Sequence, residues 1–183
     1  TPLEKERKRL NSPYFNTSFE MLEEAIRQAD RGHPVLPIHG ISKGQCACPK
    51  TDCSSPGKHP ATGRGFKDAT TDHETIKQWF SSSPSLNLAS ATGEISGLIA
   101  IDIDPRNDGD EGLAGLERLH GPLPDTVEVA TGGGGRHLFF KYPSGRYIPC
   151  SNSRVAEGVD IKGDDGYVVS PPSNHESGTR YEY

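Results

Sequence analysis

The sequence lacks any apolar stretch long enough to cross a membrane. Of its 183 residues only 32% are hydrophobic and 7% aromatic, with one Trp and one Met. No run approaches the roughly 20 apolar residues that a membrane helix needs, and the charged first ten residues contain no secretory apolar segment. We therefore expect a soluble, intracellular (cytoplasmic) protein without a membrane partner.

Apolar material for a large core is also scarce. The chain has 21 Gly and 15 Pro residues, a composition that favours short elements and many turns over a helix bundle. The length suits a single core, so we expect a charged extension over residues 1–17 and one globular domain over residues 18–183. The end, Tyr181-Glu182-Tyr183, resembles the middle of a strand. We therefore expect the chain to be part of a longer protein.

An excess of positive charge is missing as well. The formal net charge is −5, which does not indicate indiscriminate nucleic-acid binding. Cationic side chains nevertheless gather between Lys43 and Lys67, where only Asp52 opposes them. This local basic patch predicts contacts with a nucleic-acid backbone, for which the candidates are Lys50, Lys58, Arg64 and Lys67.

The first half of the chain shows helical patterns. Apolar residues at helical spacing between Phe19 and Ala29 predict a helix of about three turns, with Thr17 or Ser18 as its N-cap. A capping box over residues 71–74 predicts a second helix that ends near Ser81. Residues 35–38 read as a short strand between the two helices.

The second half shows strand patterns around one more helix. An Ile-rich strand is expected at residues 98–103, followed by a helix that Asp110 caps, with Leu113, Leu116 and Leu119 on one face. Further short strands are expected at residues 127–130, 137–142, 158–161 and 167–170. We therefore expect an α+β domain whose active face lies on a mostly antiparallel sheet.

Two aspartates end the Ile-rich strand. Asp102 and Asp104 are two residues apart, so both carboxylates lie on one face, roughly 6 to 7 Å apart along the chain. Two carboxylates this close repel each other unless a cation lies between them, and oxygen ligands favour Mg²⁺ or Mn²⁺. Two other interpretations stay open here: the aspartates cap the following helix, or a Mn²⁺-dependent glycosyltransferase uses them.

A third acid and a histidine extend the pattern. Asp160 has apolar neighbours that should face inward, so it could complete a two-metal site, or else be a surface residue beside a turn. The run Thr131-Gly-Gly-Gly-Gly-Arg-His137 opens onto a strand, and glycines let backbone N–H groups approach phosphate. It is not a P-loop, because no Gly-Lys-Ser/Thr follows. His137 is therefore a candidate phosphate contact, with a structural histidine as the alternative.

Three of the four cysteines lie in a loop at residues 40–65, which is too long for a plain connector. Together with one histidine they could form a tetrahedral structural Zn²⁺ site without an open position, made of Cys46, Cys48, Cys53 and His59. Zinc would order a loop that has little apolar material and would hold the basic patch rigid. A disulfide is the alternative, which an intracellular setting disfavours. Cys150 is expected to be a plain buried or half-buried thiol.

Six segments, taken in order, resemble the prim-pol domain of the archaeo-eukaryotic primase superfamily. They cover nearly the whole chain beyond residue 18: Gly57-Lys-His-Pro60, Phe66-Lys-Asp-Ala-Thr70, Asn87 with Thr92-Gly93, Ile101-Asp-Ile-Asp104, Gly134-Gly-Arg-His-Leu138, and Gly158-Val-Asp-Ile-Lys-Gly163 with Tyr167-Val-Val-Ser-Pro-Pro172. The resemblance implies two modules, an N-terminal α/β unit and an RRM-like antiparallel sheet, with the active site in the cleft between them. It implies a DNA primase or DNA polymerase whose partners are nucleoside triphosphates, a primer and a single-stranded DNA template.

The resemblance also assigns roles to residues. Asp102 and Asp104 match the first metal-binding motif and Asp160 the third, which together hold two catalytic Mg²⁺ or Mn²⁺ ions. His137 matches the histidine that contacts the phosphates of the incoming nucleotide. Further candidates for that nucleotide are Gly135 and Arg136, which stand where relatives often carry the Ser-x of a Ser-x-His motif, and Lys162.

Several expectations remain open at this stage. An inactive module that only binds single-stranded nucleic acid is the alternative to an enzyme. Tyr142 or Tyr147 is a candidate for discriminating between ribo- and deoxyribonucleotides. Members of the superfamily commonly precede a helicase on plasmids, phages and other mobile elements, and some serve repair or defence. A helicase domain or subunit that follows Tyr183 is therefore a candidate partner.

Overall fold

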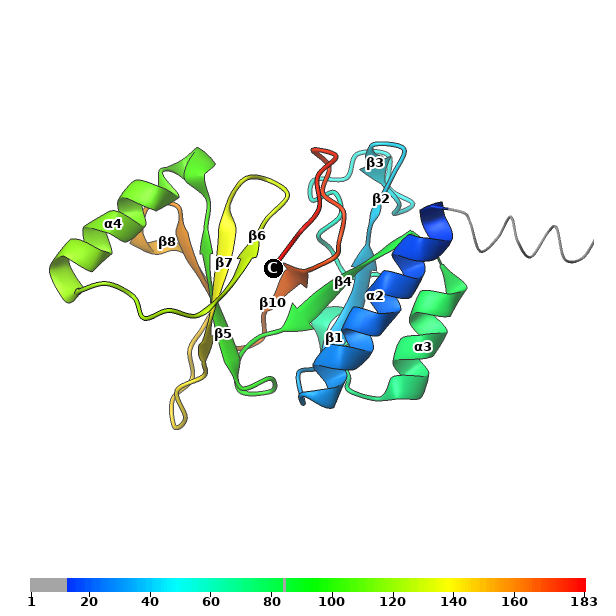
Figure 1. Ribbon diagram of the computed structural model, residues 1–183, viewed down its shortest axis with the longest axis horizontal. Coiled ribbons are helices and arrows are strands. Elements are labelled where there is room, and N and C mark those ends of the chain that lie inside the picture. Colours follow the sequence, from blue (N-terminus) through cyan, green and yellow to red (C-terminus); the bar gives the residue numbers. More distant parts are fainter. Residues whose placement is uncertain (1–12, 84) are drawn as a thin grey trace, which may run out of the picture.

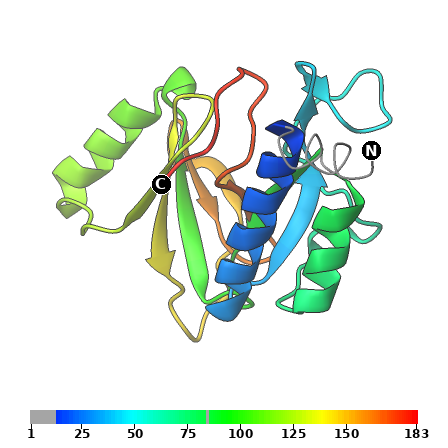
Figure 2. The same cartoon turned by 45° about the vertical axis from the view of Figure 1, so that its right-hand side comes forward.

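The structure is a computed structural model that describes residues 13–83 and 85–183. Two antiparallel sheets lie side by side, with helices on their outer faces, and the last residues of the chain run between them (Figures 1 and 2). The α+β class that the sequence predicts is confirmed. Within the described residues, no helix is both long and apolar enough to cross a membrane.

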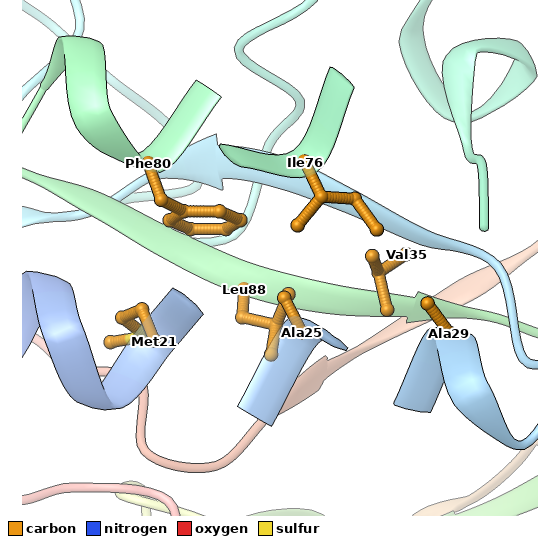
Figure 3. Close-up of a cluster of buried hydrophobic side chains, with 7 residues drawn as sticks. All are labelled: Met21, Ala25, Ala29, Val35, Ile76, Phe80 and Leu88. Carbon is orange, nitrogen blue, oxygen red and sulfur yellow. The ribbon is translucent and has the colours of Figure 1, made fainter. Parts of the chain in front are cut away.

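The first sheet has the strand order β1-β4-β10 and lies against two helices. Its elements are β1 (Val35–His39), β4 (Leu86–Ala91), β10 (Tyr167–Ser170), α2 (Pro13–Asp30) and α3 (His73–Ser82). Each helix has its apolar residues on one face, and burial of this face stabilises the module because apolar surface leaves water. Figure 3 shows the resulting cluster, which contains Met21, Ala25, Ala29, Val35, Ile76, Phe80 and Leu88.

The second sheet has the order β6-β7-β5-β9-β8. Its elements are β5 (Leu98–Ile103), β6 (Val127–Ala130), β7 (Arg136–Lys141), β8 (Ser151–Ala156), β9 (Val159–Lys162) and α4 (Gly109–His120), which η2 (Pro105–Asn107) precedes. Ile103, Leu138 and Val159 point from three strands toward Leu113 of α4 and form a buried cluster. Because side chains alternate along a strand, their sequence neighbours on β5, β7 and β9 face the other way.

The loop with the cysteines leaves the first sheet directly after β1. It contains only short elements: β2 (Ile41–Ser42), β3 (Gln45–Cys46) and, after a series of turns, η1 (Gly65–Asp68). The β2–β3 pair involves two residues of each strand. Regular backbone hydrogen bonding therefore contributes little to the order of this loop.

The predicted strands at residues 98–103, 127–130 and 167–170 have the observed bounds. The one at 35–38 differs by one residue at one end, and those at 137–142 and 158–161 are each shifted by one residue. One of the predicted strands, β10, returns to the first sheet. Besides the two-residue strands β2 and β3, the prediction missed two longer strands. β4 is buried along nearly its whole length, so it shows no alternation, whereas β8 is largely exposed and polar.

The helices begin at other residues than the sequence predicts. α2 begins at Pro13, so neither Thr17 nor Ser18 is its N-cap, and the helix reaches into the segment predicted as an extension, whose residues 1–12 lie outside the described part. The N-cap of α3 is Asp72, whose carboxylate accepts the N–H of Thr75 at 2.8 Å. α4 begins before Asp110, which lies in its first turn. Leu119 is 78% exposed and does not join the buried face.

Candidate active site

The central strand of the second sheet carries the acidic residues that the sequence singled out. In the strand register, Asp102 of β5 lies opposite His137 of β7 on one side and opposite Asp160 of β9 on the other. Side chains that are directly opposite on neighbouring strands lie on one face, with Cβ atoms about 4.5 to 5.5 Å apart. The structure therefore brings Asp160, Asp102 and His137, 58 residues apart in sequence at the extremes, into one row, called the acidic row below.

Asp104 lies two residues farther along, at the end of β5, and is held by the turn that follows. Arg106 donates from Nε to Oδ1 and from Nη2 to Oδ2, each at 2.9 Å, and Asn107 donates to Oδ2 at 3.0 Å. The hydrogen bonds of the Arg106 guanidinium lower the pKa of Asp104. Asp104 therefore stays ionised beside the acidic row, and Arg106 compensates part of its charge.

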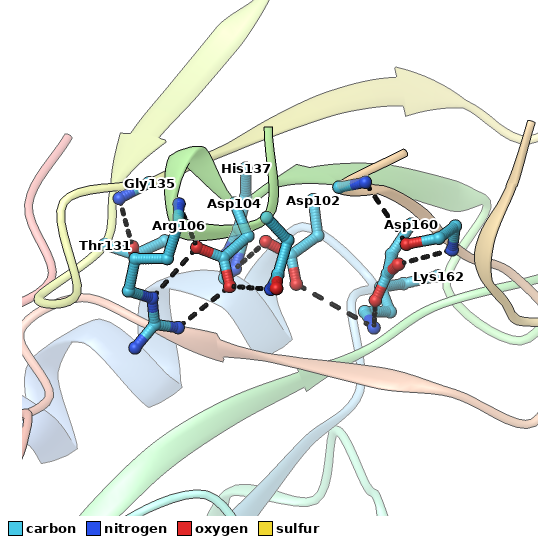
Figure 4. Close-up of polar contacts among 11 residues, drawn as sticks. Asp102, Asp104, Arg106, Thr131, Gly135, His137, Asp160 and Lys162 are labelled. Carbon is cyan, nitrogen blue, oxygen red and sulfur yellow. Dashed lines mark hydrogen bonds and ion pairs between the residues drawn. The ribbon is translucent and has the colours of Figure 1, made fainter. Parts of the chain in front are cut away.

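Lys162 lies between the other two carboxylates (Figure 4). Its Nζ donates to Asp160 Oδ2 at 2.9 Å and is 3.8 Å from Asp102 Oδ2. Asp160 also accepts the backbone N–H of Ser153 at 2.9 Å. On the other side of Asp102 lies the imidazole of His137, whose Nε2 is 3.6 Å from Oδ1. Asp102 is thus the least compensated of the three acids.

His137 is 5% exposed and packs near the rings of Phe139 and Tyr181. Its Nδ1 is buried and has no hydrogen-bond partner in the described part of the chain. Burial lowers the pKa of His137, and Asp102 opposes this shift. The imidazole is therefore neutral near pH 7, with one polar nitrogen that the protein leaves unsatisfied.

The glycine run forms the tight β6–β7 turn. Thr131 accepts the N–H of Gly134 on its carbonyl and the N–H of Gly135 on its hydroxyl, each at 3.0 Å. A side chain at Gly135 would meet the carbonyl oxygen of Ile103 at 2.4 Å, so only glycine fits there. The turn itself thus uses the N–H groups of Gly134 and Gly135, and the predicted phosphate cradle cannot draw on them without rearrangement.

A cavity of about 410 Å³ lies between the two sheets. Asp102 and His137 of the acidic row line it, whereas Asp160 lies outside its lining. The second sheet and its loops contribute Asp102, Asp104, Arg106, Gly135, His137 and Lys162, and β10 with the segment after it contributes Tyr167, His175 and Tyr181. Lys58, from the cysteine loop, completes the wall. The cavity therefore lies in the cleft between the modules, which is where the resemblance puts the active site.

Some predicted site residues do not reach this cavity. Arg136 points to the opposite face of the sheet, where its guanidinium is 3.2 Å from Asp110 and 3.9 Å from Glu128. The hydroxyl of Tyr142 donates to the Arg146 carbonyl and to Asp164. The hydroxyl of the exposed Tyr147 donates to Asp165.

Other residues reach the cavity although sequence reasoning missed them. Cys150 is exposed and lines the cavity, contrary to the predicted buried or half-buried thiol. Arg106, His175, Tyr167 and Tyr181 were not singled out, because they lie in turns or near strand ends without a periodic pattern. The only available signal was their position inside or just after segments that resemble the prim-pol motifs.

The four side chains that the sequence predicts as metal ligands come together on the loop. The ligand atoms of Cys46, Cys48, Cys53 and His59 lie within 4.8 Å of one another, and His59 Nε2 is 3.3 Å from the Sγ atoms of both Cys46 and Cys53. Although burial acts in the opposite direction, the N–H groups of Gly57 and Cys48 and the His59 ring lower the pKa of the Cys46 thiol to about 6. Three thiols and an imidazole at this spacing could bind a metal ion such as Zn²⁺.

The basic candidates on the loop have different surroundings. Lys58 immediately precedes the candidate ligand His59 and lines the cavity, and its carbonyl accepts the hydroxyl of Tyr167 at 3.0 Å. Arg64 is paired with Asp68, Nη2 to Oδ1 at 2.7 Å. Lys50 and Lys67 lie outside the cavity wall. Only Lys58 of the four is therefore brought to the acidic row.

Comparison with known proteins agrees with this architecture. No curated protein matches the chain at a significant level. A family model described as "Bifunctional DNA primase/polymerase, N-terminal" matches residues 25–183, which include every element from the middle of α2 onward and both candidate metal sites. The match covers most of the sequence, and the chain belongs to the Prim-Pol family of bifunctional DNA primase/polymerase N-terminal domains.

Proposed function

We propose that the cavity is the active site of a template-directed nucleotidyltransferase, a DNA primase or DNA polymerase that acts in replication, in repair or on a mobile element. The observation that carries the proposal is the acidic row, with Asp104 two residues along the same strand face. Like charges this close disfavour the folded state unless a cation lies between them. The arrangement therefore fits a site that binds a cationic ligand.

The donor set fits divalent cations. Asp102 lies 3.8 Å from the Lys162 ammonium and 3.6 Å from the neutral His137 ring, and both distances are longer than the 2.7 to 2.9 Å of a typical charge-assisted hydrogen bond. Carboxylate oxygens are hard ligands that suit Mg²⁺ or Mn²⁺, so Asp102, Asp104 and Asp160 would hold two such ions. When bound, the two ions would stabilise the attacking 3′-hydroxyl and the leaving pyrophosphate of an in-line displacement.

The chain's own residues would bind the nucleotide around these acids. His137 places its Nε2 3.6 Å from Asp102 Oδ1, and Lys162 offers an ammonium group that can exchange its bond to Asp160 for one to a phosphate. Arg106 keeps Asp104 ionised. Among the earlier candidates, Gly135 shapes the turn and Arg136 is held on the opposite face, so the proposed phosphate contacts are made by His137 and Lys162.

The cysteine loop would support the nucleic acid. With Zn²⁺ bound as a structural ion, its four ligands would leave no position for catalysis. The loop would then present Lys50 and Lys67, with Arg64 in part, to the backbone of a single-stranded template or primer, a contact that does not depend on base sequence.

The test is extension of a labelled primer on a single-stranded DNA template, with Mg²⁺ or Mn²⁺ and with ribo- or deoxyribonucleotides. We expect incorporation by the native chain and none by the Asp102→Ala/Asp104→Ala variant. The same reaction without primer separates initiation from extension. Equal incorporation by the double variant and the native chain would refute the metal assignment. If the native chain binds the template but incorporates no nucleotide, the result would favour a binding module.

A further inference from the structure

The segment that follows β10 brings a second buried histidine, His175, to the cavity wall. His175 is 4% exposed, and its Nε2 is buried with no hydrogen-bond partner in the part of the chain that the structure describes. The segment that carries it lies between the two sheets (Figure 1). A buried polar atom without a partner costs free energy. The protein therefore tolerates at His175 a cost that a bound acceptor could remove.

The hydrogen bonds of the other ring nitrogen define the role of Nε2. Nδ1 lies 2.9 Å from the Ser177 hydroxyl and accepts the backbone N–H of Ser177 at 3.1 Å. Because a backbone N–H can only donate, the neutral ring carries its proton on Nε2. Ser177 is itself fixed, because its hydroxyl donates to the carbonyl of Gly132 at 2.6 Å. His175 lines the cavity, and its Nε2 is therefore a hydrogen-bond donor without an acceptor among the described residues.

The glycine turn lies directly against this donor. A side chain at Gly132 would meet the Cβ of His175 at 2.2 Å. A side chain at Gly133 would lie 3.5 Å from His175 Nε2 and 3.7 Å from Cζ of Arg106. The absence of side chains at the two glycines thus lets His175 and Arg106 both approach this turn.

Apart from Asp104, the charged groups that line this end of the cavity are cations, and Glu176, whose charge acts to raise the pKa of both His175 and Arg106, lies outside the cavity wall. Asp104 takes two of the five N–H donors of Arg106 as side-chain partners, so others remain for a ligand. Lys58 lines the same cavity and is close enough to His175 to oppose its protonation. A guanidinium, an ammonium and an imidazole N–H together favour an anion with several acceptor oxygens, and phosphate has this character.

The position selects the end of a polyphosphate chain over a nucleic-acid backbone. A continuing strand needs an open path on both sides, whereas His175 is buried beneath the glycine turn and the C-terminal segment. Arg106 connects this end to Asp104 of the metal-binding acids (Figure 4). We infer that His175, Arg106 and the Gly132-Gly133 turn form a subsite for the terminal phosphates of the nucleoside triphosphate, an inference that rests on the proposed function.

The experiment measures binding with inorganic tripolyphosphate, dTTP and dTMP, each titrated in Mg²⁺ by calorimetry. His175→Phe keeps a ring against Gly132 but removes the donor, and His175→Gln keeps an N–H. The matched control is His73→Phe, on the outer surface of α3. We expect His175→Phe to weaken tripolyphosphate and dTTP about 10- to 100-fold, the range for a hydrogen bond to a charged group. Binding of dTMP should not change, and His175→Gln should retain most of the native affinity.

Thermal melting checks that each variant folds. If His175→Phe does not fold, Arg106→Gln tests the same subsite, because the Arg106 side chain is largely exposed. Unchanged tripolyphosphate affinity in the folded His175→Phe and Arg106→Gln variants, or an equal loss for dTTP and dTMP, would overturn the inference. The probe needs neither template nor turnover. Tripolyphosphate binding that depends on His175 in a chain that never extends a primer would support the subsite while the proposed polymerase function fails.

Discussion

The two candidate metal sites are built on opposite principles. The acidic row lies on three adjacent strands whose backbones are hydrogen-bonded to one another. The cysteine cluster lies on a loop with two two-residue strands and mostly turns. In the first site the backbone positions the ligands before any ion binds, whereas in the second an ion would supply much of the order.

The two sites also differ in how charge affects their stability. The carboxylates of Asp102 and Asp160, with Asp104 beside them, repel one another, so they lower stability in the absence of a cation. Among the described residues, Lys162 and Arg106 offset part of their charge. The cysteine cluster, by contrast, is held by contacts to His59 and backbone N–H groups. Substitution of the carboxylates of the acidic row should therefore abolish function while the fold is kept. Substitution of the cysteines of the loop should instead lower stability.

The largest expected effect is on catalysis at the acidic row. Asp102→Asn and Asp160→Asn should each lower kcat by about 10²- to 10⁴-fold, since a bound metal contributes several kcal/mol of charge stabilisation. The melting temperature should stay the same or rise, because one like charge is removed. Primer-extension kinetics and thermal melting check both parts. A variant that loses activity only because it unfolds would break the comparison.

The sequence predicts these two sites to different degrees for physical reasons. Alternation along β5 identifies the face of Asp102 and Asp104, since side chains on a strand alternate between faces. It says nothing about the strand register, which places Asp160 and His137 opposite Asp102. The cysteine cluster was recognisable from ligand types and their closeness in sequence, because all four ligands come from one loop.

The elements that were missed depend on tertiary contacts. β4 contains Asn87 and Ser90, polar residues that are buried because distant groups satisfy them. Asn87 binds the carbonyls of Gly57 and Asn174, and Ser90 binds Ser170 and Gln28. Such partners are not visible in a local pattern. For the same reason the approach of the C-terminal segment to the glycine turn, which brings His175 to the cavity, could not be predicted.

The second largest effect is expected at the loop. Cys46→Ser or Cys53→Ser, or removal of metal by a zinc chelator, should lower the melting temperature by about 5 to 10 °C. This corresponds to a loss of about 2 to 3 kcal/mol in a chain of this size. Metal analysis should find zinc with the native chain but not with the variants. Limited proteolysis should cut the variants, or the chelated protein, within residues 40–65.

Cys150→Ser is the matched control, because Cys150 is a free thiol outside the cluster. It should keep both the metal and the melting temperature. An unchanged melting temperature in Cys46→Ser and Cys53→Ser would mean that the loop is ordered without an ion and that the contrast between the two sites does not hold.

A smaller effect is expected from His137, the neutral member of the acidic row. His137→Ala should raise the KM for the incoming nucleotide about 10-fold, as expected for the loss of a hydrogen bond worth about 1 to 1.5 kcal/mol. It should change kcat less than the aspartate variants do. Steady-state kinetics with varied nucleotide separates the two parameters. An unchanged KM would argue against the phosphate role of His137.

The smallest effect concerns the pH dependence of stability on the cavity side. Burial, with a contribution from Lys58, lowers the pKa of His175 below its ordinary value of 6.5. The unfolded chain therefore binds this proton more readily than the native one, so the contribution is complete above about pH 6.5 and is lost as the pH falls below it. The loss should be about 1 kcal/mol at most near pH 5.5, because one pH unit of unequal protonation is worth about 1.4 kcal/mol. Urea unfolding at pH 7.5 and 5.5 should show a larger decrease in stability for the native chain than for His175→Gln. The control His73→Gln, at a half-exposed histidine on α3, should show the same decrease as the native chain. Equal decreases in all three would show that His175 is not buried in its neutral form.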